Sequence, residues 1–382
     1  MLPIQPTADP AQPNVNCDWQ RPTALAGQSK ADLDTPALLL DLDAVEANIA
    51  QLADWFRGKA CKLRPHAKTH KLPLIAQKQI AAGAIGITCA KLSEAEAFFR
   101  HGIRDILVAN EIVGAGKIER LMAVSRLGNL IICVDDAGNA REIAAAARQH
   151  GVVISVLVEV DTGLGRCGVQ PGLPTVEFVR TIAQLAGLRF RGLMGYEGGC
   201  FLKDDQEKSV RCATAYRQLV ETSELVRRAG FPVEIVTAGG SNTYALGGVY
   251  PGITDLQVGS YVTMDTFNLE YGQNFRQAVT VLATVISRPE PGRAIIDTGE
   301  KAISTDHGLP TVLREGVTVS KLDEEHGRLN LTGAAINLKV GDKIELVPSH
   351  GCTTIPLHEQ YVLVRGNRVE GIAPIAAHGA LF

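Results

Sequence analysis

Three cations and two histidines gather in one short segment, Arg64-Pro65-His66-Ala67-Lys68-Thr69-His70-Lys71. A lysine that is kept from bulk water and lies close to other cations has a lowered pKa, because desolvation and like charge both disfavour the ammonium form. A neutral lysine amine is the nucleophile that Schiff-base chemistry requires. On these residues alone, a Schiff-base lysine and a basic surface loop that contains histidines are equally good interpretations.

A second group of reactive residues lies near the C-terminus, in Pro348-Ser349-His350-Gly351-Cys352-Thr353-Thr354. In a strand, His350 and Cys352 would point to the same side, because side chains alternate. An imidazole and a thiolate suit a soft or borderline divalent metal, Zn²⁺ above all. Mn²⁺ and Mg²⁺ are the alternative ions. Two ligands leave positions open for water or substrate, as in a catalytic site. A buried cysteine beside a structural histidine is the commoner alternative.

Polar and glycine-rich loops follow several apolar, strand-like runs. Arg166 lies in a glycine-rich loop after a run that ends at Asp161, and Tyr196 and Glu197 follow another run. Two glycine-serine loops, residues 238–243 and 258–261, come after the last runs, where barrel enzymes hold phosphate. A phosphate cradle together with a Schiff-base lysine indicates pyridoxal phosphate, the electron sink of amino-acid chemistry.

The composition is that of an ordinary globular protein. The 382 residues are 46% hydrophobic and 21% charged, with a formal net charge of -3. No basic run indicates nucleic acid, and no apolar run approaches the roughly 20 residues that span a bilayer. The eight cysteines include no CxxC pair, which favours reduced, mostly buried thiols. We therefore expect a cytoplasmic protein.

Short apolar runs alternate with amphipathic segments over most of the chain, after a strand-like opening at residues 37–42. The predicted helices are 44–56, 73–82, 93–99, 116–124, 137–149, 175–186 and 206–229. The predicted strands between them are 85–88, 105–108, 130–134, 153–160, 190–194, 233–236 and 255–258. About eight such units favour a closed parallel (β/α)₈ barrel over an open sheet. No GxGxxG follows the first strand, which argues against a dinucleotide fold.

The pattern changes to antiparallel strands near residue 276. Residues 279–286, 294–297, 343–347 and 361–367 have strand character, with a hairpin-like turn at Arg365-Gly366-Asn367-Arg368. The predicted fold class is therefore α/β, a TIM-type (β/α)₈ barrel with a C-terminal antiparallel β-domain. The predicted divisions are an N-terminal arm at 1–32, the barrel at 33–275 and the β-domain, with the metal ligands, at 276–382.

Taken together, these segments resemble the D-threonine aldolase and D-serine dehydratase family. Its members are pyridoxal-phosphate enzymes with an alanine-racemase-like barrel and a β-domain. The resemblance extends from about residue 33 to the end of the chain and is specific as a set. The matching segments are Asp34-Thr35-Pro36, residues 64–71, Ser93-Glu94-Ala95, Gly165-Arg166-Cys167-Gly168, Gly259-Ser260-Tyr261, Met264-Asp265, Glu325-His326-Gly327 and residues 348–352.

The resemblance implies a role for each of these residues. Lys68 would form the Schiff base with pyridoxal phosphate, although Lys71 also matches a family lysine, and Arg166 would face the pyridine nitrogen. His350 and Cys352 would hold the metal, which gives His350 a part in catalysis. A homodimer is also implied. The residues implied to hold the ring and phosphate are Tyr196, Gly239, Gly240, Ser241, Asn242, Gly259, Ser260 and Tyr261.

Two reactions of D-3-hydroxy-α-amino acids fit these roles. Deprotonating the β-hydroxyl leads to retro-aldol cleavage into glycine and an aldehyde; expelling it leads to dehydration into a 2-keto acid and ammonia. In the aldolases of this family, the second metal ligand looks like an aspartate. Here that position is Cys352, and a cysteine is also what the resemblance implies for the zinc-dependent D-serine and D-threo-3-hydroxyaspartate dehydratases. The histidine that follows the tyrosine in the aldolases is absent here, and Glu197 could replace it as base. Tyr196 and the barrel as a whole favour the aldolase, which we predict.

Two other functions remain open from the sequence. A racemase on this barrel needs a tyrosine from the β-domain, and Tyr361 is the one tyrosine after residue 276. A cofactor-carrying homeostasis protein would need neither the β-domain nor His350 and Cys352.

Overall fold

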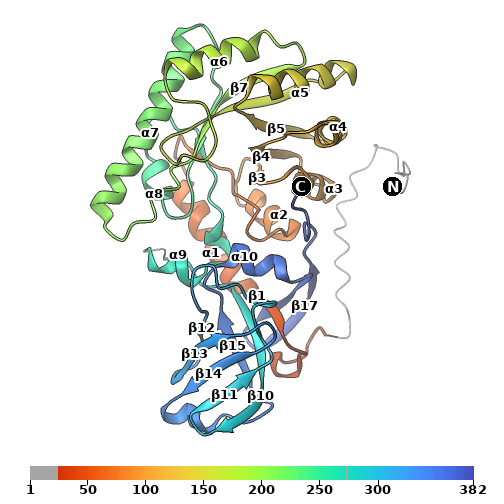
Figure 1. Ribbon diagram of the computed structural model, residues 1–382, viewed down its shortest axis with the longest axis vertical. Coiled ribbons are helices and arrows are strands. Elements are labelled where there is room, and N and C mark those ends of the chain that lie inside the picture. Colours follow the sequence, from red (N-terminus) through yellow and green to blue (C-terminus); the bar gives the residue numbers. More distant parts are fainter. Residues whose placement is uncertain (1–24, 272–273) are drawn as a thin grey trace.

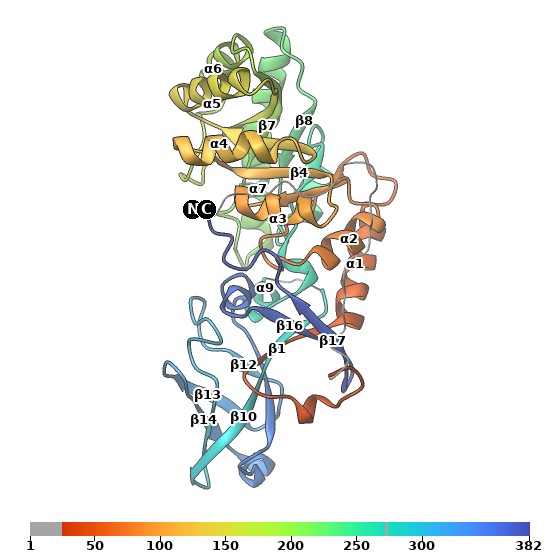
Figure 2. The ribbon, with the colours of Figure 1, turned by 90° about the vertical axis from the view of Figure 1, so that its right-hand side faces the viewer.

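The computed structural model describes residues 25–271 and 274–382. Two lobes lie along its long axis, a barrel lobe and a β lobe, with helix α1 (Leu42–Phe56) near their junction (Figures 1 and 2). Residues 1–24, most of the predicted N-terminal arm, lie outside the described residues. Within the described ranges, no helix is both long enough and apolar enough to cross a membrane.

The barrel lobe is built on a sheet of eight parallel strands in the order β2-β9-β8-β7-β6-β5-β4-β3. A parallel bridge between His66 and Thr88 joins the two ends of this order, so the sheet closes on itself. The predicted (β/α)₈ architecture is confirmed. The strands are β2 (Lys62–Leu63), β3 (Ile87–Cys89), β4 (Asp105–Glu111), β5 (Asn129–Val134), β6 (Ile154–Val160), β7 (Leu188–Gly195), β8 (Ile235–Ala238) and β9 (Asp255–Leu256).

Each barrel strand is followed by a helical segment, and the large helices lie outside the strands (Figure 1). Apolar residues therefore cover both faces of each strand: one set packs under the helices, and a smaller set fills the barrel interior. The interior set includes Leu107, Cys133, Leu157 and Met194. The helices are α2 (Pro73–Ala81), α3 (Leu92–Arg100), α4 (Ala115–Val124), α5 (Ala137–Gln149), α6 (Leu173–Ala183), α7 (Asp205–Arg228), α8 (Tyr244–Gly247), η2 (Ser260–Val262) and α9 (Thr266–Glu270).

The β lobe is a nine-stranded sheet in which most pairs are antiparallel. The predicted hairpin is confirmed, because Arg365 pairs with Arg368 across the turn between β16 and β17. The elements are β10 (Val279–Glu290), β11 (Arg293–Ile296), β12 (Thr311–Val312), β13 (Val317–Leu322), β14 (Gly327–Leu331), η3 (Gly333–Asn337), β15 (Lys343–Val347), α10 (Gly351–Thr354), η4 (Ile355–Leu357), β16 (Gln360–Arg365) and β17 (Arg368–Pro374).

The first strand, β1 (Ala37–Asp41), lies in the β lobe and not in the barrel, where the sequence pattern had placed it. It pairs antiparallel with β10 and parallel with β16. Leu38 and Leu40 join the main core, and Leu39 packs in a separate small cluster on the other face. A strand covered on both faces has the same continuous apolar pattern in either sheet, so the pattern did not reveal its location. The preceding short helix η1 (Lys30–Asp32) lies next to β17.

Candidate active site

A cavity of about 260 Å³ opens where the barrel strands end. Chemistry in such barrels takes place at this end, because the loops that follow the strands converge there. Most of the predicted cofactor-binding residues line it, together with two carboxylates that the sequence analysis did not single out. The residues that line it include His66, Lys68, Thr69, Glu111, Glu159, Arg166, Tyr196, Gly239, Gly240, Ser241, Gly259 and Ser260.

Lys68 lies in the loop that follows β2 and lines the cavity. Backbone hydrogen bonds fasten this loop to both sides of the barrel seam: the His66 N–H donates to the Val258 carbonyl (3.1 Å), and the Ala67 N–H to the Thr88 carbonyl (2.7 Å). In the described part of the chain, the Lys68 side chain is exposed and forms no ion pair. An amine on a fixed backbone, open to the cavity, is the arrangement that covalent cofactor attachment requires.

The other cations of this segment do not surround Lys68 as the sequence predicted. The buried Arg64 forms an ion pair with the partly exposed Asp105, and Lys71, only 4% exposed, pairs with Glu94. A buried cation with its own carboxylate is electrostatically compensated, so crowding by like charge does not describe this site. The same contacts separate the two candidate lysines: Lys71 is structural, and Lys68 faces the cavity.

The two histidines of the segment are neutral. Burial lowers the pKa of His70 to about 3. Burial, reinforced by the charge of Lys68, also lowers the pKa of His66 well below its ordinary value. His66 therefore presents an uncharged imidazole to the cavity.

The two glycine-serine loops form one wall of the cavity. For the buried backbone N–H groups of Ser241 and Gly259, no acceptor is found among the described residues. Buried N–H groups without an acceptor are rare, and two in adjacent loops suit an anion. Gly239 has a φ of +85°, and a Cβ there would lie 2.6 Å from Leu256 Cδ2, so only glycine fits. These loops fit the phosphate of the predicted cofactor.

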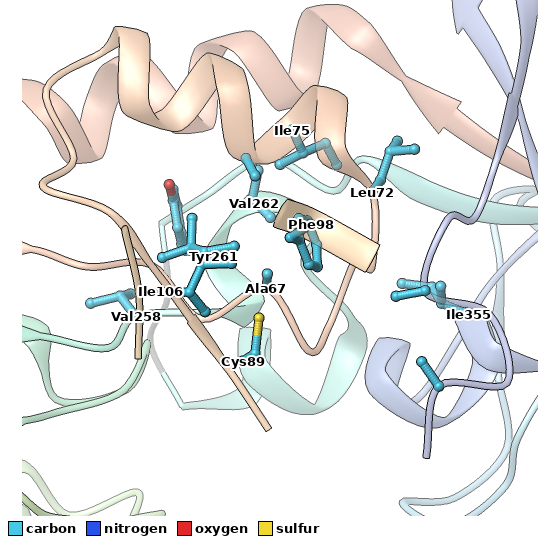
Figure 3. Close-up of a cluster of buried hydrophobic side chains, with 14 of the residues drawn as sticks. Ala67, Leu72, Ile75, Cys89, Phe98, Ile106, Val258, Tyr261, Val262 and Ile355 are labelled. Atoms are coloured by element: carbon cyan, nitrogen blue, oxygen red, sulfur yellow. The ribbon is translucent and has the colours of Figure 1, made fainter. Parts of the chain in front are cut away.

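Asn242 and Tyr261 do not line the cavity, in contrast to their predicted role. Asn242 Nδ2 donates to the Cys200 carbonyl (2.6 Å). The Tyr261 ring lies among buried apolar side chains (Figure 3), and its hydroxyl accepts a hydrogen bond from Gln79 Nε2 (2.9 Å). The backbone N–H of Tyr261 donates to Ser241 Oγ (3.0 Å). Both residues therefore stabilise the two glycine-serine loops without lining the cavity.

The predicted metal ligands reach the cavity region from the β lobe. His350 and Cys352 lie close enough to shift each other's pKa, and Cys352 Sγ lies 3.1 Å from Thr69 Oγ1, next to Lys68. His350 Nδ1 lies 2.7 Å from Asp306 Oδ2. A carboxylate at Nδ1 fixes the tautomer and leaves Nε2 as the ligand atom, the usual support of a metal-binding histidine.

The His350 imidazole of this pair is protonated at neutral pH, so a metal ion would have to displace its proton to bind there. Burial alone would lower the pKa of His350, but its hydrogen bonds with Cys352 and Asp306 raise the pKa to about 9. Burial opposes ionisation of Cys352, yet the adjacent His350 lowers the pKa of this thiol below its ordinary value. The contact with His350 thus favours the thiolate form of Cys352, which is the form that binds Zn²⁺.

The segment that carries these ligands is not the strand that we predicted. Strand β15 ends at Val347 and helix α10 begins at Gly351, with His350 as its N-cap in an extended conformation. The two side chains are brought together by this strand-to-helix turn instead of by strand alternation.

Known proteins match this chain over both lobes. The alanine racemase N-terminal domain matches residues 40–266, and a serine dehydratase domain matches residues 278–364. The sequence is 39% identical to a D-threonine aldolase from Arthrobacter sp., over 94% of this chain and 96% of that protein. It is 36% identical to a 3-hydroxy-D-aspartate aldolase from Paracoccus denitrificans (strain Pd 1222), over 93% and 95%.

Solved structures agree. A crystal structure of D-threonine aldolase from Filomicrobium marinum superposes with a TM-score of 0.90 at 39% identity, covering 94% of this chain and 99% of that one. The chain belongs to the D-threonine aldolase and D-serine dehydratase family.

Within this family, a D-threo-3-hydroxyaspartate dehydratase from Delftia sp. HT23 is more distant, with a TM-score of 0.82 and 29% identity over 91% of this chain and 99% of that one. A cysteine-to-alanine variant of a D-threo-3-hydroxyaspartate dehydratase is described as metal-free. The predictions of family, fold class and a lyase are confirmed by these relatives.

The geometry does not support the predicted role of Glu197 as a base. Tyr196, which lines the cavity, and Glu197 are neighbours and point to opposite sides of the strand end. Glu197 is 4% exposed and accepts hydrogen bonds from Tyr216 Oη (2.8 Å), the Gly239 N–H (3.1 Å) and Thr243 Oγ1. Its carboxylate ties the cradle loop to helix α7 behind the barrel wall.

Arg166 lines the cavity and lies next to Tyr196. Its guanidinium carbon is 5.5 Å from the centroid of the Tyr196 ring, and its Nη2 is 3.5 Å from Glu159 Oε1. Burial raises the pKa of Tyr196, so its phenol stays protonated. The pair therefore offers one fixed cation and one neutral hydroxyl to a ligand.

Four residues of the site were missed by the sequence analysis. Asp306 and His307 lie between β11 and β12, where the sequence gives no periodic signal; their ligand atoms and that of His350 lie within 4.8 Å of one another. Glu111 and Glu159 could have been found, because each is a charged residue at the end of an apolar strand.

Proposed function

We propose that this protein is a pyridoxal-phosphate- and divalent-metal-dependent lyase. It cleaves D-3-hydroxy-α-amino acids between Cα and Cβ to give glycine and an aldehyde. One observation carries the proposal: Cys352 Sγ is 3.1 Å from Thr69 Oγ1, the neighbour of Lys68. Thr69 lines the same cavity as Lys68, so the metal ligands of the β lobe lie directly behind the cavity wall next to the lysine. The aldolase relatives match the chain over both lobes.

The barrel residues hold the cofactor in this proposal. Lys68 would attach it through its amine, and Arg166 would lie beside its ring. Ser241 and Gly259 would donate their backbone N–H groups to its phosphate. When bound, pyridoxal phosphate supplies an electron sink for the negative charge that develops at Cα.

The β-lobe residues hold the metal. Zn²⁺ is the ion that His350 and Cys352 favour by donor type. Asp306 keeps the His350 ring oriented, and Thr69 hydrogen-bonds to the sulfur of Cys352. When bound, the ion supplies Lewis acidity that eases loss of the proton from the substrate hydroxyl. The Cα–Cβ bond then breaks, its electrons remain on Cα, and Cα later takes up a proton.

A dehydratase is the second candidate, and Cys352 is the observation in its favour. A thiolate ligand is the feature that this chain shares by resemblance with the zinc-dependent dehydratases. The test is to give the purified protein, with cofactor and Zn²⁺, D-threonine and to quantify both product pairs. Glycine with an aldehyde supports the proposal. Ammonia with a 2-keto acid as the main products would refute it in favour of the dehydratase.

A racemase is not supported. The tyrosine that this reaction would need, Tyr361, is fully buried, and its hydroxyl donates to the His70 carbonyl (2.9 Å). A phenol held in this way does not face a substrate.

We also propose that the protein is a cytoplasmic homodimer. The support for the dimer is the family resemblance alone, and the support for the cytoplasm is the scattered cysteines, which favour reduced thiols. Light scattering after size-exclusion chromatography tests the oligomeric state, and a monomer at micromolar concentration would refute the dimer.

A further inference from the structure

Two carboxylates that the proposed mechanism does not use lie at the mouth of the barrel. Glu111 ends β4, and Glu159 lies one residue before the end of β6. Leu107 and Leu157 on these strands face the barrel interior. Because side chains alternate, residues two and four positions further on also face inward. Both carboxylates accordingly line the cavity.

The two carboxylates lie against each other. Their nearest ligand atoms, with Cys167 Sγ, fall within 4.8 Å of one another. Glu111 Oε1 is buried and receives no hydrogen bond from the described residues. Two buried carboxylates at this distance cannot both ionise without strong repulsion, and one shared proton removes it. Burial and the contact with Glu111 raise the pKa of Glu159 to about 8.

One cation faces the pair: Arg166 Nη2 lies 3.5 Å from Glu159 Oε1. The other titratable groups nearby add one carboxylate: Asp135 follows β5 and accepts a hydrogen bond from the Gly168 N–H (3.0 Å). The thiols of Cys133 and Cys167 are neutral, because burial raises the pKa of each, that of Cys167 to about 11.

We propose that Glu111 and Glu159 share one proton and act together as a single negative charge that positions Arg166 against the pyridine-nitrogen side of the cofactor. This inference rests on the proposed function, since it takes the cofactor ring to lie beside Arg166. Neither glutamate is a catalytic residue; both act through the guanidinium. The proposal has a specific consequence: removing one carboxylate leaves the net charge unchanged, because the remaining one then ionises.

The test compares Glu111→Gln, Glu159→Gln and the double variant in the holoenzyme, with Glu221→Gln on the exposed face of α7 as control. Pyridoxal phosphate affinity is measured from the absorption of the bound cofactor. We expect each single variant to stay within about threefold of the wild type and the double variant to bind about tenfold or more weakly. Single variants that each lose as much as the double variant would overturn the proposal.

An infrared titration tests the proton directly. The wild type is expected to show the carbonyl stretch of one protonated carboxyl that is lost as the pH rises through about 8, and each single variant should lack it. Absence of this band from the wild type at neutral pH would overturn the proposal, even if the double variant fails to fold. So would an additional bound metal ion per chain that the double variant loses, since the pair would then hold an ion instead of a proton.

The two proposals fail separately. A wild-type protein that does not attach pyridoxal phosphate to Lys68 would refute the proposed function, and the positioning role with it. The infrared titration would still decide whether the pair shares a proton. A wild type that attaches the cofactor but shows equal losses in the single and double variants would refute this inference alone.

Discussion

Lys68, which lines the cavity, and Cys352, which contacts its neighbour Thr69, come from two lobes that are built differently. Lys68 follows a barrel strand, and backbone hydrogen bonds to Val258 and Thr88 fix its loop on both sides. Cys352 lies in a helix of one turn, and its support comes from side chains: His350, Thr69 and, through His350, Asp306. Backbone hydrogen bonds also fasten the β-lobe segment, because the N–H groups of Thr266 and Phe267 donate to the carbonyls of Pro348 and Ser349. The two sides differ at the reactive groups: side-chain contacts hold the imidazole and the thiol, and none holds the amine of Lys68 among the described residues.

The two sides also differ in what they can bind. The barrel residues offer an amine, a guanidinium and backbone N–H groups, which suit a phosphorylated ring. The β-lobe residues offer a thiolate and an imidazole, which suit a metal. Changes on one side should therefore impair one cofactor and leave the binding of the other nearly intact.

The largest effect is expected on the barrel side, at Lys68. Lys68→Ala should lower activity by about 10³-fold or more and abolish covalent cofactor attachment, with stability unchanged. Lys71→Met should instead lower stability: it leaves the buried Glu94 carboxylate without its countercharge and should cost about 3–5 kcal/mol of unfolding free energy. Urea denaturation and steady-state kinetics measure both, with the exposed Lys117→Met as control. A Lys68→Ala variant with normal activity would contradict the assignment.

The next effect is expected on the β-lobe side. Cys352→Ala should remove tight metal binding and most activity while pyridoxal phosphate still binds. Asp306→Asn should weaken metal affinity about 10- to 100-fold, because His350 loses the carboxylate that orients it. Competition with a coloured chelator measures the affinity, and the exposed Glu315→Gln is the control in the same lobe. Loss of pyridoxal phosphate together with the metal in Cys352→Ala would show that the two sides are not separable.

Glu197 sharpens the comparison within the barrel, because it lies behind the cavity wall. Glu197→Gln should cost about 1–3 kcal/mol of stability, since an amide cannot accept all the hydrogen bonds from Tyr216, Thr243 and Gly239. Turnover per folded molecule should change less than about threefold. A catalytic base would instead cost about 10²- to 10⁴-fold. A loss of that size in a fully folded variant would restore the base role.

The smallest effect concerns the contact between the lobes. Glu46 on α1 pairs with Arg365 on β16, which lowers the pKa of Glu46 from 4.5 to about 2. Because the folded-state pKa is depressed, the stabilisation is present above pH 4.5 and is lost as the pH falls towards 2. The pair is partly exposed, so it should contribute less than about 1 kcal/mol.

Glu46→Gln should therefore flatten the dependence of stability on pH in this acid range and change little at pH 7. Urea denaturation at several pH values measures this, with Glu221→Gln as control. An unchanged pH profile would mean that the ion pair does not stabilise the lobe contact.

The sequence predicted the barrel side of the site well because position along a strand decides position in a barrel. Lys68, Arg166, Tyr196 and the glycine-serine loops all follow strands, and all line the cavity. The alternation of side chains along a strand also predicts that Glu111 and Glu159 point into the barrel.

The rest depends on contacts between distant parts of the chain. Whether Asp306 meets His350, or whether Arg64 and Lys71 find carboxylates, depends on the packing of separate elements, which composition and spacing do not encode. The location of β1 was missed for a related reason, since an apolar strand fits either sheet.

The most direct test of the account is to find where pyridoxal phosphate is attached. The holoenzyme is reduced with borohydride and digested, and the labelled peptide is sequenced by mass spectrometry. The account predicts a phosphopyridoxyl group on Lys68 and on no other lysine. A label on Lys71, or no labelled peptide from this segment, would contradict it.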